Sequence, residues 1–210
     1  MTTIIDDYIT TLDPKARGRI KGVAKLVIAD NGPRADEAFD TTYEPVRVLE
    51  DEEAVSGDGW TLRAVATPGH TSNHLCFALE ESGALFTGDH VMGWSTSVIV
   101  PPDGDMGDYL ASLEKLYERD DRVYYPAHGK PVERPQKLVR SMIGHRRQRE
   151  RQILKFLGQE PLSLPEFIPL MYKGLDTRLE KAAQMSVHAH LIDLERRGQV
   201  HRSNDRWAAL

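Results

Sequence analysis

Two histidines and an aspartate that follow short apolar runs are the residues of this sequence best suited to chemistry. His70 stands in TPGHTSNH, Asp89 in FTGDH and His128 in YPAHG, and each has a glycine beside it. Imidazole and carboxylate groups are the usual non-thiolate ligands of zinc, and an adjacent glycine lets the backbone turn tightly. One histidine in a loop is more often a surface or capping residue. Three such residues in similar settings favour a metal site.

Two further histidines, His74 and His90, lie beside these motifs. We interpret them as structural groups or as hydrogen-bonding partners that orient the ligands. The histidine and arginines of 145–151 fall on a predicted helix, where a solvated face is the simpler interpretation. His188 and His190 are two residues apart on another predicted helix, so they point to different faces and do not predict a metal pair.

The elements that must position these residues are short strands and one amphipathic helix. Met106, Tyr109, Leu113 and Leu116 recur at helical spacing and predict a helix that packs on a sheet. Because loops at strand ends meet along one edge of a sheet, we expect the three candidate ligands to converge there. The expected strands are 24–30, 45–49, 60–67, 74–80, 84–87 and 122–126, with a helix at 14–23 before them.

The C-terminal third of the sequence has a different character. It predicts a helix at 136–157, a short helix at 162–172 and a third helix at 177–197 that Gly198 ends. Two short strands around a Ser-Asn-Asp turn follow. Three helices followed by a hairpin are typical of a winged helix, so we divide the chain into domains 1–134 and 135–210.

Composition indicates an ordinary globular protein, with 40% hydrophobic and 28% charged residues. The net charge of −5 is uneven, because residues 145–210 hold 12 basic and 8 acidic residues. A net charge of +4 there is weak evidence for nucleic-acid binding. Cys76 lies in an apolar run and is expected to be buried. No apolar run is long enough to cross a bilayer and no signal peptide is visible, so we expect a soluble cytoplasmic protein without a membrane partner.

Three segments in fixed order closely resemble the later motifs of metallo-β-lactamase-fold hydrolases. They are TPGHTSNHLCFAL, ALFTGDHVMGWSTSVIVPPDGDMGDYLASLEKL and YYPAHGKPV. The likeness covers roughly residues 35–210 and is strongest to the branch with a C-terminal winged helix, which includes β-lactamase-like endoribonucleases. It implies a zinc site of one or two ions, with His70 on the first metal, Asp89 bridging and His128 on the second. It also implies a bridging hydroxide that attacks an ester, amide or phosphodiester.

One part of that family pattern is missing from this sequence. The family's main ligand motif, His-x-His-x-Asp-His, lies upstream, yet no histidine precedes His70. IIDDYITTLDP occupies its place, and we interpret Asp6, Asp7 and Asp13 as exposed acids and a helix cap. We therefore expect the α+β class, with an incomplete αββα sandwich followed by a winged helix. We also expect a site that binds one metal weakly or none, and impaired activity.

Two functional hypotheses follow. The first is a metal-dependent hydrolase whose substrate is a small ester, a lactam or RNA. The second is a truncated, catalytically inactive relative that acts as a scaffold or binds nucleic acid through the winged helix. An unpaired sheet edge also predicts self-association of the 1–134 portion and a homo-oligomer.

Overall fold

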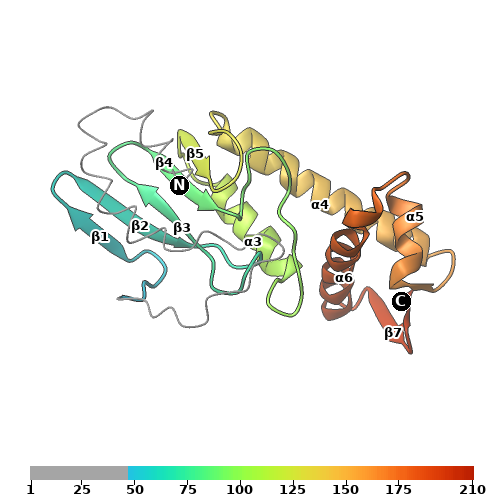
Figure 1. Cartoon of the computed structure of the whole chain (residues 1–210). Coiled ribbons are helices and arrows are strands. Elements are labelled where there is room, and N and C mark those ends of the chain that lie inside the picture. Colours follow the sequence, from blue (N-terminus) through green and yellow to red (C-terminus); the bar gives the residue numbers. More distant parts are fainter. Residues whose placement is uncertain (1–46) are drawn as a thin grey trace.

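The computed structural model describes residues 47–210. The expected helix at 14–23, the expected strand at 24–30 and the acids Asp6, Asp7 and Asp13 lie outside these residues. Within the described range, no helix is both long enough and apolar enough to span a bilayer. Two units are joined by one long helix, α4, which runs from the sheet to the C-terminal helices (Figure 1).

The first unit is a five-stranded sheet in the order β1-β2-β3-β4-β5. Its neighbours from β1 to β4 pair antiparallel, whereas β5 pairs parallel to β4. Strands β2, β4 and β5 therefore run in the same direction and end at the same edge. The strands are β1 Ala54–Gly57, β2 Trp60–Ala66, β3 Leu75–Leu79, β4 Ala84–Gly88 and β5 Val123–Pro126.

Alternation along the strands separates two apolar faces of this sheet. One face carries Val65, Cys76, Leu85 and Tyr124, which pack with helix α3, Met106–Tyr117. The opposite face carries a smaller cluster that includes Phe86 and Tyr125, stacked with ring centroids 5.7 Å apart. Helix α3 thus covers the sheet as its apolar spacing predicts, and Asp105 caps its first turn by accepting from the Asp108 amide.

Helix α4, Pro135–Leu157, belongs to both units. Val139, Met142 and Ile143 pack in the core beneath the sheet, whereas Ile153 and Leu157 pack in the core of the C-terminal unit. The first half of the helix therefore supports the sheet, although our domain division assigns the whole helix to the C-terminal domain.

The C-terminal unit has the hairpin and the last helix that its sequence predicts, and a shorter second helix. A three-stranded sheet in the order β6-β8-β7 closes over α6, and Leu191, Leu194 and Trp207 are buried between them. Gly198 ends α6 with a φ of 68°, and Asn204 forms the hairpin turn with a φ of 54°. The elements are β6 Leu162–Ser163, η1 Leu164–Glu166, α5 Phe167–Met171, η2 Thr177–Leu179, α6 Glu180–Arg196, β7 Val200–Ser203 and β8 Arg206–Ala209.

Several sequence-based expectations need correction. The part of the expected strand at 45–49 that the structure describes, residues 47–49, has no regular structure, and a four-residue strand, β1, begins at Ala54 instead. The expected single helix at 162–172 is divided into a short strand, a 3-10 turn and α5. The third helix begins with a 3-10 turn at Thr177–Leu179, and its α-helical part is α6.

Candidate metal site

The three candidate ligands lie at one edge of the sheet, just beyond the ends of three strands that run in the same direction. His70 follows β2, Asp89 follows β4 and His128 follows β5. Backbone hydrogen bonds join the last two loops, from the Ala127 amide to the Gly88 carbonyl at 3.0 Å and from the Gly93 amide to the His128 carbonyl at 2.9 Å. The topology therefore holds Asp89 and His128 next to each other.

Asp89 and His128 form the most suggestive pair at this edge. Asp89 Oδ1 lies 3.4 Å from His128 Nε2, and this buried oxygen makes no hydrogen bond to any residue of 47–210. A buried carboxylate oxygen without a partner is costly, since such groups are almost always hydrogen-bonded or bound to a cation. The His128 side chain is 48% exposed, so a ligand can approach the pair from solvent.

His70 is oriented by a backbone group from a distant loop. Its Nδ1 lies 2.8 Å from the carbonyl oxygen of Val98, which can only accept a hydrogen bond. Nδ1 therefore carries a proton, and in the neutral form of the ring the lone pair is on Nε2. This is the arrangement in which metal-binding histidines are usually held, with a carbonyl fixing the tautomer.

The residues at this edge fit a divalent cation in part. Asp89 and His128 supply an unpaired oxygen and an imidazole nitrogen side by side, and His70 has the tautomer of a ligand. Between residues 47 and 210, however, no three His, Cys, Asp or Glu side chains are gathered as a metal-binding group. Asp89 and His128 are thus a candidate pair of metal ligands, and His70 is not gathered with them in one group.

His74 and His90 lie behind the edge in a row of rings. His70 and His74 have ring centroids 6.4 Å apart, His74 and His90 5.6 Å, and His90 and Tyr109 4.7 Å. Burial, with the charge of His70, lowers the pKa of His74 to about 4, and burial chiefly lowers the pKa of His90 well below its usual value. Both imidazoles are therefore neutral near pH 7.

Close packing fixes His74 in this row. Its Nδ1 is 2.8 Å from the hydroxyl of buried Thr67, which also lies 3.2 Å from the sulfur of Cys76. A Cβ at Gly88, where φ is 51°, would come within 2.7 Å of His74 Nε2, so glycine is needed at that turn. Burial raises the pKa of the Cys76 thiol to about 12, which makes it the inert residue that the sequence predicts.

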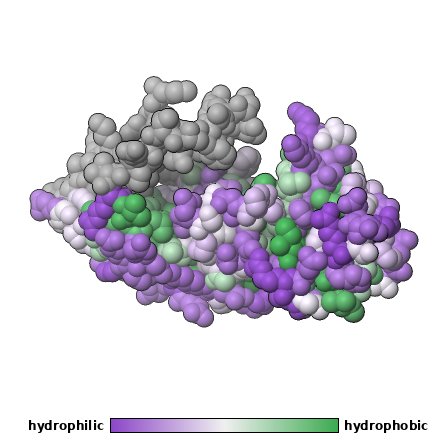
Figure 2. Space-filling view, turned by 90° about the horizontal axis from the view of Figure 1, so that it is seen from below, coloured by the Kyte–Doolittle hydropathy of each residue, from purple (hydrophilic) through white to green (hydrophobic). Residues whose placement is uncertain are grey.

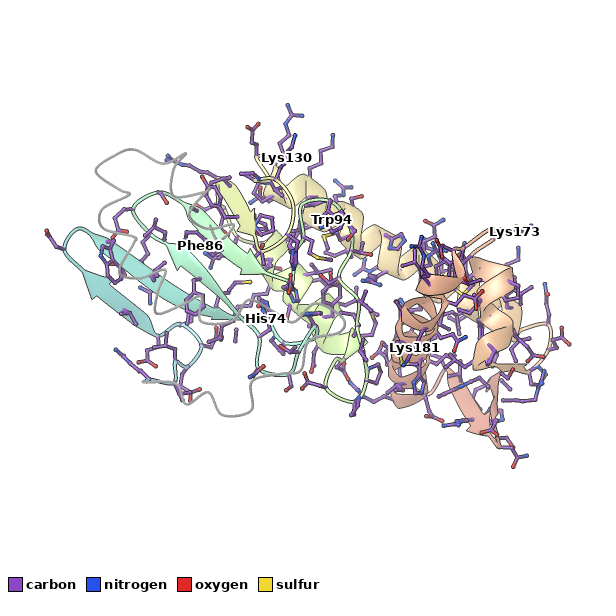
Figure 3. The ribbon with its side chains drawn as sticks, in the orientation of Figure 1. His74, Phe86, Trp94, Lys130, Lys173 and Lys181 are labelled. Atoms are coloured by element: carbon purple, nitrogen blue, oxygen red, sulfur yellow. The ribbon has the colours of Figure 1, made fainter. Side chains whose placement is uncertain are left out.

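The segment between Asp89 and α3 forms the rim of the site. Trp94 is 76% exposed, and Gly93 before it packs against the backbone of Lys130 in the loop that follows β5 (Figure 3 labels Trp94 and Lys130). Further along, a groove of about 400 Å³ opens between Pro101, Met106 and the α6 residues Ala189 and Ile192. Figure 2 shows hydrophobic residues where the two units meet. His188 and Arg196 add polar groups to the groove wall.

Comparison with known families agrees with this geometry. The model of the metallo-beta-lactamase superfamily matches residues 7–128, which is more than half of the chain. The chain belongs to the metallo-beta-lactamase superfamily. The model of the beta-lactamase associated winged helix domain matches residues 163–207. These matches confirm the expected α+β class, the expected family and the C-terminal winged helix.

Curated relatives in this superfamily are considerably longer than the chain. A beta-lactamase-like protein 2 homolog of Drosophila melanogaster is 37% identical over 146 residues, which cover 68% of this chain and 48% of the relative. An atrochrysone carboxyl ACP thioesterase of Paecilomyces divaricatus is 41% identical over 172 residues, covering 78% and 54%. The chain thus spans about half the length of these relatives.

Solved structures of the superfamily share the fold. A metallo-beta-lactamase family protein of Thermus thermophilus matches with a TM-score of 0.68 and 27% identity, covering 77% of this chain and 54% of that one. A beta-lactamase domain protein of Burkholderia ambifaria matches with a TM-score of 0.71 and 24% identity, covering 78% and 52%.

Sequence reasoning missed three groups that support the metallo-beta-lactamase site. Ser97 and Tyr109 donate hydrogen bonds to the backbone beside Asp89, and Arg146 packs against both. Assigning Arg146 to a solvated face was wrong, because it is only 3% exposed. Helical spacing could have found it, since position 146 continues the buried stripe of Val139, Met142 and Ile143.

Proposed function

We propose that this protein is a metal-dependent hydrolase that cleaves a carboxylic ester or thioester with an apolar acyl or aryl group. The observation that carries the proposal is the buried Oδ1 of Asp89, which makes no hydrogen bond within residues 47–210 and lies 3.4 Å from His128 Nε2 at the common edge of β4 and β5. Superfamily membership supports hydrolysis as the reaction class.

In this proposal each residue at the edge has a distinct task. Asp89 and His128 would hold the cation, and the Val98 carbonyl accepts from His70 Nδ1, which leaves Nε2 as the nitrogen that can bind a ligand. A divalent cation held there would lower the pKa of a bound water, so that hydroxide is available at neutral pH, and would polarise the carbonyl that is attacked. Neutral His74 and His90 fill the space behind the edge without adding positive charge that would repel a cation.

The apolar groove between α3 and α6 favours an ester or thioester with a hydrocarbon part. Pro101, Met106, Ala189 and Ile192 can cover such a group, and burial of each methylene stabilises binding by about 0.8 kcal/mol. Two of the relatives at 40–41% identity are called carboxyl ACP thioesterases, which agrees with a thioester.

RNA is a less favourable substrate, because the arginines at the end of α6 and in the hairpin already pair with carboxylates. Arg196 pairs with Asp105 across the two units, and Arg197 lies 2.9 Å from Glu150. In the hairpin, Arg202 pairs with Asp205 and Arg206 with Glu166. Arginines that already have carboxylate partners contribute less to phosphate binding.

A metal-reconstitution assay tests the proposal. Protein treated with a chelator and then supplied with Zn²⁺ or Mn²⁺ would be incubated with an aryl ester, an acyl thioester, a chromogenic β-lactam and a diaryl phosphodiester. We expect ester or thioester hydrolysis that appears with metal and disappears with chelator, at a rate at least about 100-fold above that of the phosphodiester. Protein that binds no metal and hydrolyses none of these substrates would instead support the inactive relative with a scaffold function.

Acyl-chain length tests the groove separately. Ile192→Ala removes three carbons from the groove wall, so we expect KM for an octanoyl thioester to rise about 10-fold while KM for the acetyl thioester stays unchanged. An exposed position on the same helix, Lys181→Ala, serves as the control. Equal changes in KM for the octanoyl and the acetyl thioester would show that the groove does not bind the acyl chain.

A further inference from the structure

A buried arginine connects the winged-helix unit to the segment that carries Asp89. Arg146 lies in the middle of α4 and is 3% exposed. Among residues 47–210, no carboxylate forms an ion pair with it, and its buried Nε makes no hydrogen bond. Burying a cation without a counter-charge is expensive, and an apolar residue would pack there at lower cost. Stability alone therefore does not explain an arginine at this position.

The guanidinium of Arg146 contacts three elements at once. Its Nη2 donates to the Ser97 carbonyl in the rim segment, and its Nη1 donates to the Ser186 hydroxyl of α6 at 3.2 Å. Its central carbon lies 5.2 Å from the centre of the Tyr109 ring of α3, within the range of a cation–π contact. A planar group with several fixed donors suits such a junction, and a lysine ammonium cannot reproduce it.

Ser97 and Tyr109, the two partners of Arg146 on the sheet side, are themselves hydrogen-bonded to the backbone of the candidate site. The Ser97 hydroxyl donates to the carbonyl oxygens of Asp89 and His90, the latter at 3.0 Å. The Tyr109 hydroxyl donates to the His90 carbonyl at 3.1 Å. Arg146 is therefore separated from the Asp89 backbone by a single residue, Ser97, and it reaches the adjoining peptide through Tyr109 as well.

We propose that Arg146 is a positioning residue that holds the Asp89 segment in its ligand conformation and makes this conformation depend on the docking of α6. Hydrogen-bonded groups one shell away from a ligand orient it, and their loss commonly weakens metal binding 10- to 100-fold. The metal-binding part of the inference rests on the proposed function, in which Asp89 is a ligand. The ordering of residues 89–98 does not rest on it.

Hydrogen exchange measured by mass spectrometry, together with zinc titration, tests the inference. Arg146→Met keeps the length of the side chain and removes the donors, so we expect exchange in residues 89–98 to quicken at least about 10-fold and zinc affinity to fall at least about 10-fold. Arg146→Lys should recover only a small part of either effect. Arg140→Met, an exposed position on the same helix, should change neither.

A milder variant keeps the test decisive if Arg146→Met does not fold. Ser186→Ala removes only the α6 end of the junction, and we expect a two- to fivefold increase in exchange at 89–98 while residues 162–171 keep their wild-type rates. Unchanged exchange at 89–98, or an equal increase in every segment, would overturn the inference and leave Arg146 with a packing role. A wild-type protein that binds no zinc would contradict the proposed function, and the exchange rates would still decide the role of Arg146.

Discussion

Histidines at the sheet edge and histidines behind it contact different groups, although the two kinds lie close in the chain. His128 is half exposed and faces an unpaired carboxylate oxygen, and His70 presents Nε2 with its tautomer fixed by a carbonyl. His74 and His90 instead pack against each other and Tyr109, with depressed pKa values. The difference teaches that burial decides what an imidazole can do, because His90 follows β4 in the same loop as Asp89 and is nevertheless fully buried. His70 lies in the turn that follows β2, whereas His74 leads directly into β3.

The largest effect is expected at the edge. Asp89→Asn keeps the size of the side chain but removes its charge, so we expect metal-dependent hydrolysis to fall about 1,000-fold, which corresponds to about 4 kcal/mol of transition-state stabilisation. Asp103→Asn is the matched control, because Asp103 is an exposed carboxylate in the same segment that bonds the Ser72 hydroxyl. Comparable activity of Asp89→Asn and Asp103→Asn would show that Asp89 is not part of the active site.

Removing an imidazole behind the edge and removing one at the edge should change the free energy of unfolding by different amounts. His90→Ala leaves a cavity at a fully buried position, so we expect a loss of about 2–4 kcal/mol in the free energy of unfolding. His128→Ala at the half-exposed edge should change it by less than about 0.5 kcal/mol. Urea denaturation of the metal-free variants measures both values, and equal losses would contradict the division into two groups.

A smaller effect is expected in the pH dependence of the free energy of unfolding, and it arises from a buried imidazole. Burial, with the nearby charge of Arg146, lowers the pKa of His190 to about 3, whereas its pKa in the unfolded chain is near 6.5. The unfolded chain therefore binds the proton first as pH falls, and stability is lost from about pH 6.5 down to the folded pKa. We expect His190→Gln to reduce the loss between pH 7 and pH 5 by about 1–2 kcal/mol in urea denaturation. Parallel pH profiles for wild type and variant would show that His190 is not a buried neutral imidazole.

Much of the sheet could be predicted from the sequence, because its signals are local. Short apolar runs separated by turn residues located β2 to β5, and apolar residues three and four apart located α3. The strand expected at 45–49 was wrong for residues 47–49, which have no regular structure and lead into a turn in which the Glu53 amide donates to the Glu50 carbonyl at 3.1 Å. Strand β1 was missed because its four residues, AVSG, carry almost no pattern.

The candidate site could be predicted only in part. The proximity of Asp89 and His128 follows from strand ends alone, since β4 and β5 are parallel neighbours. The contact of His70 with the Val98 carbonyl joins residues 28 positions apart through a segment without periodic pattern, so no local signal predicts it. Arg146 was assigned to solvent on account of its charge, although its position on the apolar stripe of α4 indicated burial.

Zinc titration of the chelator-treated protein tests the central claim most directly, because it measures the Asp89–His128 pair without reference to any substrate. The wild type is expected to bind zinc, and His128→Ala is expected to bind it at least about 100-fold more weakly. His201→Ala, which alters an exposed histidine of β7, should bind zinc as the wild type does. Zinc binding that is absent from the wild type, or equal in all three proteins, would contradict the assignment of a metal site to this edge of the sheet.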